Sequence, residues 1–241
     1  MWVDPSSWAF SIWGLIYSLI AVYIVYQVLP NSWVAPPKGE YSRNEDLLVN
    51  KIYWILPVHL IGNASWLFLF QANTAATFWI AEVVIGLMLA SAIWILKLCL
   101  EERLSLWELI GLRVGFTIYC GWLTAATILG FSIAGKASGM NDAKMGVGYE
   151  EGWAVAILYI GWAIYIASSW WQKNPLFAAV MFWPWAAIAD QQGGKGRVVI
   201  QYHCYTIMSM HAVYVSVFLT WMIYNKVRYN HTKKEIKGLF Y

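Results

Sequence analysis

The sequence carries little charge. Only 12% of its 241 residues are Asp, Glu, Lys or Arg, whereas 60% are hydrophobic. A soluble domain has about 25% charged and about 45–50% apolar residues. So few charged groups cannot cover the surface of such an apolar chain, which excludes a soluble enzyme and predicts an integral membrane protein. The net charge of +3 is too small to indicate nucleic-acid binding.

Groups that carry chemistry are also scarce. Cys99, Cys120 and Cys204 all lie in apolar runs and lack the spacing of a disulfide framework or a zinc site, so we expect three buried thiols. No paired carboxylates, activated nucleophile or metal-ligand set stands out. The sequence therefore favours a protein that is not an enzyme, with no catalytic residue and no metal site.

Long apolar runs are abundant. A membrane-spanning helix needs about 20 mostly apolar residues, and seven segments come close to or reach that length: 7–29, 52–70, 78–98, 106–134, 152–172, 175–189 and 199–225. The sixth is short and contains Pro184, so it is interpreted either as a crossing or as a re-entrant segment. We therefore expect an all-α membrane protein, a polytopic helix bundle with about seven transmembrane segments.

The polar segments divide this bundle. Residues 1–134 are expected to form a four-helix core, 135–151 a Gly-rich polar loop, 152–225 three additional transmembrane helices, and 226–241 a basic tail. Most Lys and Arg residues fall in the loops of one side, which places the C-terminus on the cytoplasmic or matrix-like side of the bilayer. Mitochondrial and bacterial inner membranes both fit this pattern.

Several polar residues lie inside the apolar runs. Arg113 is the deepest charge and must either snorkel or face a polar partner. Asn63 shares a helix face with Trp66 and Phe70, and its amide is expected to bond to a neighbouring helix, with a ligand contact as the alternative. Glu82 lies near the start of the third run, from where it can reach the interface.

Histidine and tryptophan raise the question of a cofactor. His59 could pair with His203 or His211 to hold a haem iron, although hydrogen-bonded packing is the favoured interpretation. The chain has 17 Trp, and those near the ends of the runs are typical interfacial anchors. Deeper indoles either pack helices or line a flat apolar cavity suited to a planar ligand such as a porphyrin or a sterol.

Three segments together resemble the tryptophan-rich sensory protein family, which is related to the translocator proteins. They are 10–17 (FSIWGLIY), 63–70 (NASWLFLF) and 113–128 (RVGFTIYCGWLTAATI), and 185–188 (WAAI) adds a weaker match. Their order agrees with the second, third and fifth helices of the family, and 78–98 takes the place of the fourth. The sequence departs from the family pattern at Gly115, where the family has Pro, and at Gly130, where it has Asn.

The resemblance implies a helix bundle that binds porphyrins, sterols or similar lipids between its helices. The positions that match the family's ligand site are Trp13, Tyr17, Asn63, Trp66, Tyr119, Trp122 and Ala126. Helix periodicity separately places Trp13 with Tyr17, and Tyr119 with Trp122 and Ala126, on shared faces. The alternative is that the same aromatic residues only pack the bundle.

The helix and loop that precede the first matching segment in the family have no counterpart in this sequence. We expect that a helix from the second half or a partner chain closes the pocket, or that the pocket is lost. The leading hypothesis is a membrane protein that binds or carries a hydrophobic small molecule. The alternatives are a structural accessory subunit of a larger membrane complex or homo-oligomer, and, with less support, a secondary transporter.

Overall fold

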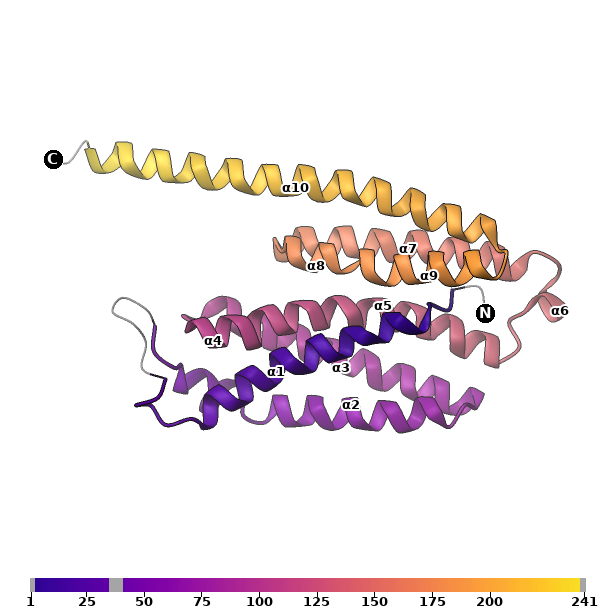
Figure 1. The fold of residues 1–241 in the computed structure, drawn as a ribbon, viewed down its shortest axis with the longest axis horizontal. Coiled ribbons are helices and arrows are strands. Elements are labelled where there is room, and N and C mark those ends of the chain that lie inside the picture. The colour runs from indigo at the N-terminus through magenta and orange to yellow at the C-terminus, as the bar shows by residue number, and fades with distance from the viewer. Residues whose placement is uncertain (1–2, 35–40, 239–241) are drawn as a thin grey trace.

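The computed structural model describes residues 3–34 and 41–238, with side chains as far as Tyr229. Within these residues the regular structure is helical, and the long helices run roughly parallel in two groups (Figure 1). The first group contains η1 (Ser7–Ser11), α1 (Ile12–Val28), η2 (Leu47–Ile52), α2 (Ile55–Gln71), α3 (Ala75–Glu101), α4 (Leu106–Glu108), η3 (Leu109–Val114) and α5 (Gly115–Ala137). The second contains α7 (Tyr149–Gln172), α8 (Pro175–Val180), α9 (Phe182–Gly194) and α10 (Val198–Gly238), and the short α6 (Asp142–Met145) lies in the connection. The predicted all-α class is confirmed.

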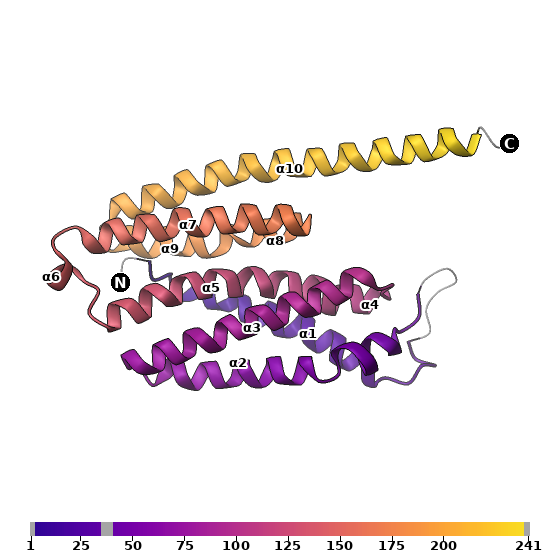
Figure 2. The same ribbon diagram turned by 180° about the vertical axis from the view of Figure 1, so that it is seen from behind.

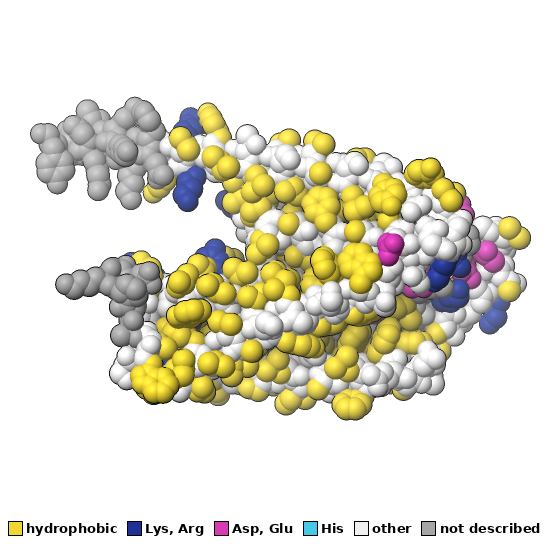
Figure 3. Space-filling model, viewed as in Figure 1, with side chains coloured by type: hydrophobic (Ala, Val, Ile, Leu, Met, Phe, Trp, Pro, Cys, Tyr) yellow, Lys and Arg dark blue, Asp and Glu magenta, His cyan; other side chains and the backbone are white. Residues whose placement is uncertain are grey.

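Five helical stretches are long and apolar enough to cross a membrane. They are Ser7–Val28, Ala75–Glu101, Leu106–Ala137, Tyr149–Gln172 and Val198–Tyr229. Hydrophobic side chains cover the middle of the face drawn in Figure 3, whereas most of the charged side chains lie toward its two ends. These features confirm a multi-pass membrane protein in a lipid bilayer, while the count of seven spans remains a prediction because α2 and the α8–α9 segment fall short of that length.

The sixth predicted segment consists of two helices that meet at Met181. Pro184 lies in the first turn of α9, where backbone N–H groups have no partner inside the helix. The missing N–H of proline therefore costs α9 no internal hydrogen bond, but it prevents α8 from continuing unbroken. The sequence correctly singled out this segment as irregular, and the proline explains where it divides.

α5 lies on the side of the first group that faces the second group, as the views from both sides show (Figures 1 and 2). In an apolar 18-residue segment of the stretch Leu106–Ala137, 67% is buried inside the protein. The corresponding share is 33% or less in each of the other four candidate spans. A Cβ added at Gly121 would lie 2.7 Å from the Cβ of Val180, so α8 packs directly on the α5 backbone. The Tyr165 hydroxyl of α7 donates to the Gly121 carbonyl oxygen.

A second close approach joins α1 to the π-helix η3. A Cβ added at Gly111 would lie 2.7 Å from the backbone nitrogen of Tyr23 and 2.8 Å from the carbonyl oxygen of Leu19. Backbone atoms cannot move aside as a flexible side chain could, so only glycine permits this contact. Gly111 therefore fixes the position of α1 against the segment that leads into α5.

The boundaries of two predicted segments differ in the structure. The helix α6 lies within the predicted polar loop 135–151, and α7 begins at Tyr149. The predicted basic tail, 226–241, begins inside α10, which runs without a break to Gly238. The side chains after Tyr229 lie outside the described residues. The three cysteines are buried and unpaired, as predicted.

Replacing Gly111 with Ala should separate α1 from η3. The added methyl group overlaps backbone, so we expect a loss of about 1–3 kcal/mol in stability, as for other overpacked sites. Thermal unfolding in detergent would show this as a lower melting temperature. Gly14→Ala is the matched control in α1, because nothing lies within 4 Å of its added Cβ. Equal melting temperatures for the two variants would contradict the proposed contact.

Candidate functional site

A pocket opens between α2, α3 and α5 in the first group of helices. The cavity volume that a water-sized sphere can reach is about 50 Å³, below the about 300–1,000 Å³ of typical small-molecule sites, so the lining side chains must move apart to admit a ligand. Its walls are mostly aromatic and aliphatic side chains: Pro5, Phe10, Trp66, Phe70, Phe78, Ala81, Glu82, Trp122, Ala126, Leu129, Gly130 and Ile133. Such walls suit a hydrophobic molecule and offer little to a charged metabolite.

Trp13 of α1 joins the aromatic residues beside this pocket. Its ring centroid lies 6.2 Å from those of both Trp66 and Trp122, and its plane is nearly perpendicular to the ring of Trp122. It also stacks on Tyr17, with a centroid distance of 5.4 Å, and meets the ring of Tyr119 edge-on at 5.5 Å. Edge-to-face and offset contacts of this kind fix ring orientations, so Trp13 sets the positions of both indoles in the pocket wall.

A hydrogen-bonded chain adjoins Trp13 and connects three helices. The Tyr17 hydroxyl of α1 donates to Asn63 Oδ1 of α2 at 2.9 Å, and Asn63 Nδ2 donates to the Tyr119 hydroxyl of α5. Asn63 and Tyr119 are buried, and His59, whose ring centroid is 4.9 Å from that of Tyr119, packs beside them. The amide uses its acceptor and one donor between helices, as the packing interpretation of Asn63 predicts.

The segment 3–11, called here the N-terminal strap, contributes Pro5 and Phe10 to the pocket wall. The ring of Phe10 meets that of Trp122 edge-on at 6.0 Å. α9 holds the strap from the other side: Ser6 Oγ and Trp8 Nε1 donate to Asp190 Oδ2 at 2.7 and 3.0 Å. The strap therefore bounds the pocket, and α9 holds the strap without lining the pocket itself; whether a helix of the second half closes the pocket remains a prediction.

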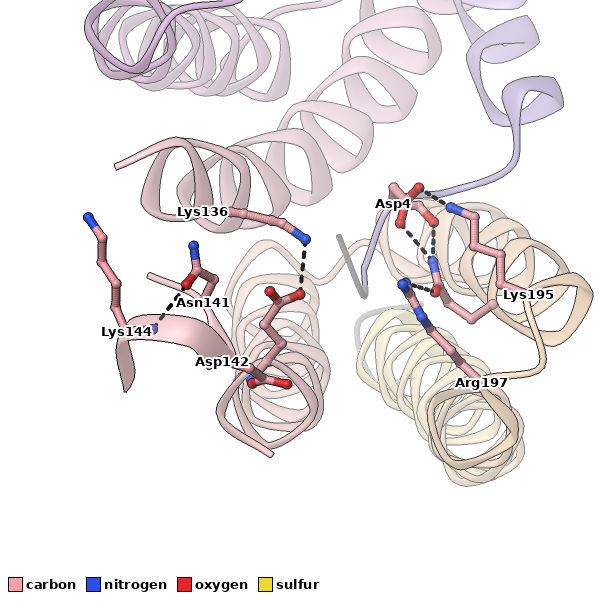
Figure 4. A network of polar contacts seen from close by, with 9 residues as sticks. Asp4, Lys136, Asn141, Asp142, Lys144, Lys195 and Arg197 are labelled. Carbon is pink, nitrogen blue, oxygen red and sulfur yellow. Dashed lines mark hydrogen bonds and ion pairs between the residues drawn. The ribbon is translucent and has the colours of Figure 1, made fainter. Parts of the chain in front are cut away.

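A charged cluster holds the start of the strap at one end of the bundle (Figure 4). Asp4 accepts from Lys195 Nζ at 2.6 Å and from Gln192 Nε2 at 2.9 Å, and Arg197 donates to the oxygen of the same Gln192 side chain. Partial burial raises the pKa of the Asp4 carboxyl, but the hydrogen bonds from Lys195 and Gln192 outweigh it and hold the pKa below its ordinary value of 3.8. Asp4 is therefore ionised at neutral pH.

Asp4→Asn should loosen the strap. The variant loses the ion pair with Lys195, so we expect faster amide hydrogen exchange within 3–11 at pH 7. Because the pKa of Asp4 is lowered on folding, its contribution is complete above pH 3.8 and is lost as the pH falls through the folded value. Acidification to pH 3 should therefore loosen the strap of the wild type more than that of the variant, after correction for intrinsic exchange rates.

Asp142→Asn is the control for this experiment, because Asp142 lies at the same end of the bundle but accepts from the backbone N–H of Glu150, outside the strap. Exchange in 3–11 that is equally slow in wild type and Asp4→Asn would show that the cluster does not hold the strap.

The structure brings together all seven residues that the resemblance singled out. Trp66, Trp122 and Ala126 line the pocket, whereas Trp13 contacts both indoles. The remaining three, Tyr17, Asn63 and Tyr119, form the hydrogen-bonded chain on the other side of Trp13. Whether these residues bind a ligand remains a prediction.

Sequence reasoning missed two parts of the pocket. Pro5 precedes the first predicted span, 7–29, and Phe10 lies near its start, but no periodicity indicates that either residue lines the pocket. Glu82 was expected to reach the interface but is 7% exposed and faces the pocket. The substitution of the family's Asn by Gly130 was the available signal, because the Glu82 carboxyl lies against that glycine.

Arg113 lies outside the pocket. It belongs to η3, nine residues before Trp122, which corresponds to roughly 13 Å along a helix. Its side chain is half-buried, and its carbonyl oxygen accepts from the Thr117 hydroxyl. Its position near the end of the α4–α5 stretch fits the snorkelling interpretation better than a place in the candidate site.

The three histidines of the apolar runs each have a hydrogen-bond partner. His59 Nδ1 lies 2.7 Å from Ser91 Oγ, and His211 Nε2 lies 2.9 Å from the carbonyl oxygen of Ala178. His203 Nδ1 lies 3.2 Å from the hydroxyl of Tyr159. His59 belongs to the first group of helices and the other two to the second, so the contacts favour packing over a shared haem.

Asn63→Leu tests the hydrogen-bonded chain. It leaves the fully buried Tyr119 hydroxyl without its partner, so we expect a loss of about 1–3 kcal/mol in unfolding free energy. Ser65→Ala is the control in the same helix, because the exposed Ser65 hydroxyl donates to the Ile61 carbonyl oxygen of α2 itself and does not join two helices. Adding Tyr119→Phe to Asn63→Leu should recover part of the loss; a double variant as unstable as the sum of its parts would argue against the pairing.

The fold and the pocket define a multi-pass helical membrane protein with an aromatic site between its helices. The family model described as TSPO-like protein matches residues 1–235, and the chain belongs to this family. The chain is therefore a membrane protein of the TspO type, and the resemblance found in its sequence is confirmed. No curated protein and no solved structure gives a significant match.

Proposed function

We propose that this protein binds or carries a hydrophobic small molecule, a porphyrin, a sterol or a related lipid, in the pocket between α2, α3 and α5. The observation that carries the proposal is the pair of indoles from different helices, Trp66 and Trp122, whose positions Trp13 sets. Trp66 comes from α2, Trp122 from α5 and Trp13 from α1, so the aromatic wall exists only when these three helices are packed together.

The composition of the walls supports this class of ligand. Trp66, Phe70, Phe78 and Trp122 supply flat apolar surfaces, and such surfaces gain most from a molecule with fused rings. The indole N–H of Trp122 is buried and has no hydrogen-bond partner among the described residues. It is available to an acceptor on a ligand.

The strap supports a carrier in particular. Phe10 and Pro5 cover the pocket, and the strap is held by polar contacts with α9 rather than by a continuous helix. Contacts of this kind are local and can break without disturbing the helices. The strap is therefore suited to open and close the site while the bundle stays intact.

A fluorescent sterol and protoporphyrin IX test the proposal. Energy transfer from tryptophan to either molecule should saturate in the micromolar range and should be lost in Trp66→Ala/Trp122→Ala, because that variant removes two walls of the pocket. Trp94→Ala/Trp171→Ala is the matched control, since both of these indoles are more than half exposed.

Two results would contradict ligand binding at this site: a signal that does not saturate, and a signal that persists unchanged in Trp66→Ala/Trp122→Ala. In that case the fold would serve as an accessory subunit, and co-purification of partner chains in mild detergent would be the next measurement.

A further inference from the structure

Glu82 of α3 places a carboxyl group in the wall of the pocket. The residue is 7% exposed, and it lines the pocket together with Phe78 and Ala81 of the same helix. Its Oε1 atom is buried and has no hydrogen-bond partner among the described residues. The described residues therefore offer no hydrogen bond that accounts for this buried carboxyl oxygen in a pocket with aromatic walls.

Gly130 of α5 creates the place for this carboxyl. A Cβ at position 130 would overlap Glu82 Oε2 and would lie 3.0 Å from Glu82 Cδ, so no other residue could stand there without displacing the carboxyl. Gly130 lines the pocket as well. The pair Glu82–Gly130 therefore positions the carboxyl between α3 and α5, away from the interface that the side chain could otherwise reach.

Two polar groups toward the end of the bundle, near Glu82 along the chain or in the fold, have other partners. One turn before Glu82, Trp79 Nε1 donates to Ser138 Oγ at 2.9 Å, and Lys136 at the end of α5 pairs with Glu150 at 3.0 Å. Within the described residues, no ion pair joins Glu82 to a cation. The buried carboxyl is costly without a countercharge or a donor, and an ionisable group inside a membrane bundle is characteristic of a functional site.

We propose that Glu82 accepts the ammonium group of a hydrophobic amine bound in this pocket. The inference rests on the proposed function and narrows its ligand class: the apolar body lies on the indoles of Trp66 and Trp122, and the charged nitrogen pairs with the Glu82 carboxylate. A charge-assisted hydrogen bond in an apolar site is stronger than a neutral one, and the ring of Phe78 adds attraction for a cation. A ligand whose only polar group is a carboxylate meets like charge and is disfavoured.

Three pyrene derivatives with one ring system and different head groups test this ligand class. They are 1-pyrenemethylamine, 1-pyrenemethanol and 1-pyrenecarboxylic acid, titrated by energy transfer from tryptophan into the full chain in phosphatidylcholine nanodiscs, with empty nanodiscs to correct for partitioning. The wild type should bind the amine about tenfold more tightly than the alcohol, and the acid more weakly than either.

Glu82→Gln removes the charge at constant size. The affinity for the amine should fall to within about threefold of the affinity for the alcohol. The affinity for the alcohol should not change, because its neutral head group loses no countercharge. Glu101→Gln makes the same change at an exposed position of the same helix and should keep the wild-type order. Gly130→Ala keeps the carboxyl but displaces it, so it should also reduce the preference for the amine.

The outcomes separate this inference from the function on which it rests. If the alcohol binds saturably and loses binding in Trp66→Ala/Trp122→Ala, but Glu82→Gln leaves the preference for the amine unchanged or no preference exists, the role of Glu82 is overturned while the pocket stands. If none of the three molecules binds saturably, both proposals fail.

Discussion

The close approach of other elements to the α4–α5 stretch is the constraint on which this structure depends. Lipid tails are as apolar as helix side chains, so helices in a membrane associate mainly through tight packing and hydrogen bonds between them. Glycine permits the contact of α1 at Gly111, of α8 at Gly121 and of the Glu82 carboxyl at Gly130. The intervening residues Tyr119 and Trp122 reach the candidate site from the same helix, so its geometry follows from this packing.

The N-terminal strap connects the two groups of helices at the site. Its apolar residues Pro5 and Phe10 face the pocket, whereas Asp4, Ser6 and Trp8 bond to the α9 region. The second group of helices therefore takes part in the candidate site without lining it. This arrangement gives the segment 175–194 a role that its short length does not suggest, because α9 holds the N-terminal strap in place.

The sequence predicts the helices well, because long apolar runs leave few alternatives, and it predicts the meeting of Trp13, Asn63 and Trp122 through the family resemblance. It does not predict the strap, whose polar contacts join residues more than 180 positions apart. Nor does it predict the burial of Glu82, because an acidic residue one or two turns inside a span can equally well reach water. The carboxyl could lie either in the pocket or at the interface, and the absence of a side chain at Gly130 makes room for it in the pocket. The sequence does not show that Gly130 faces Glu82, because that depends on how α3 and α5 pack.

Photoaffinity labelling would test most directly whether the aromatic pocket is a binding site. A sterol that carries a diazirine on its ring system would be irradiated with the protein in nanodiscs, and the labelled peptides would be mapped by mass spectrometry. The account predicts labels concentrated in 66–82 and 122–133, with competition by the unlabelled sterol. Labels spread over the lipid-facing surface of α10 and insensitive to competitor would contradict it.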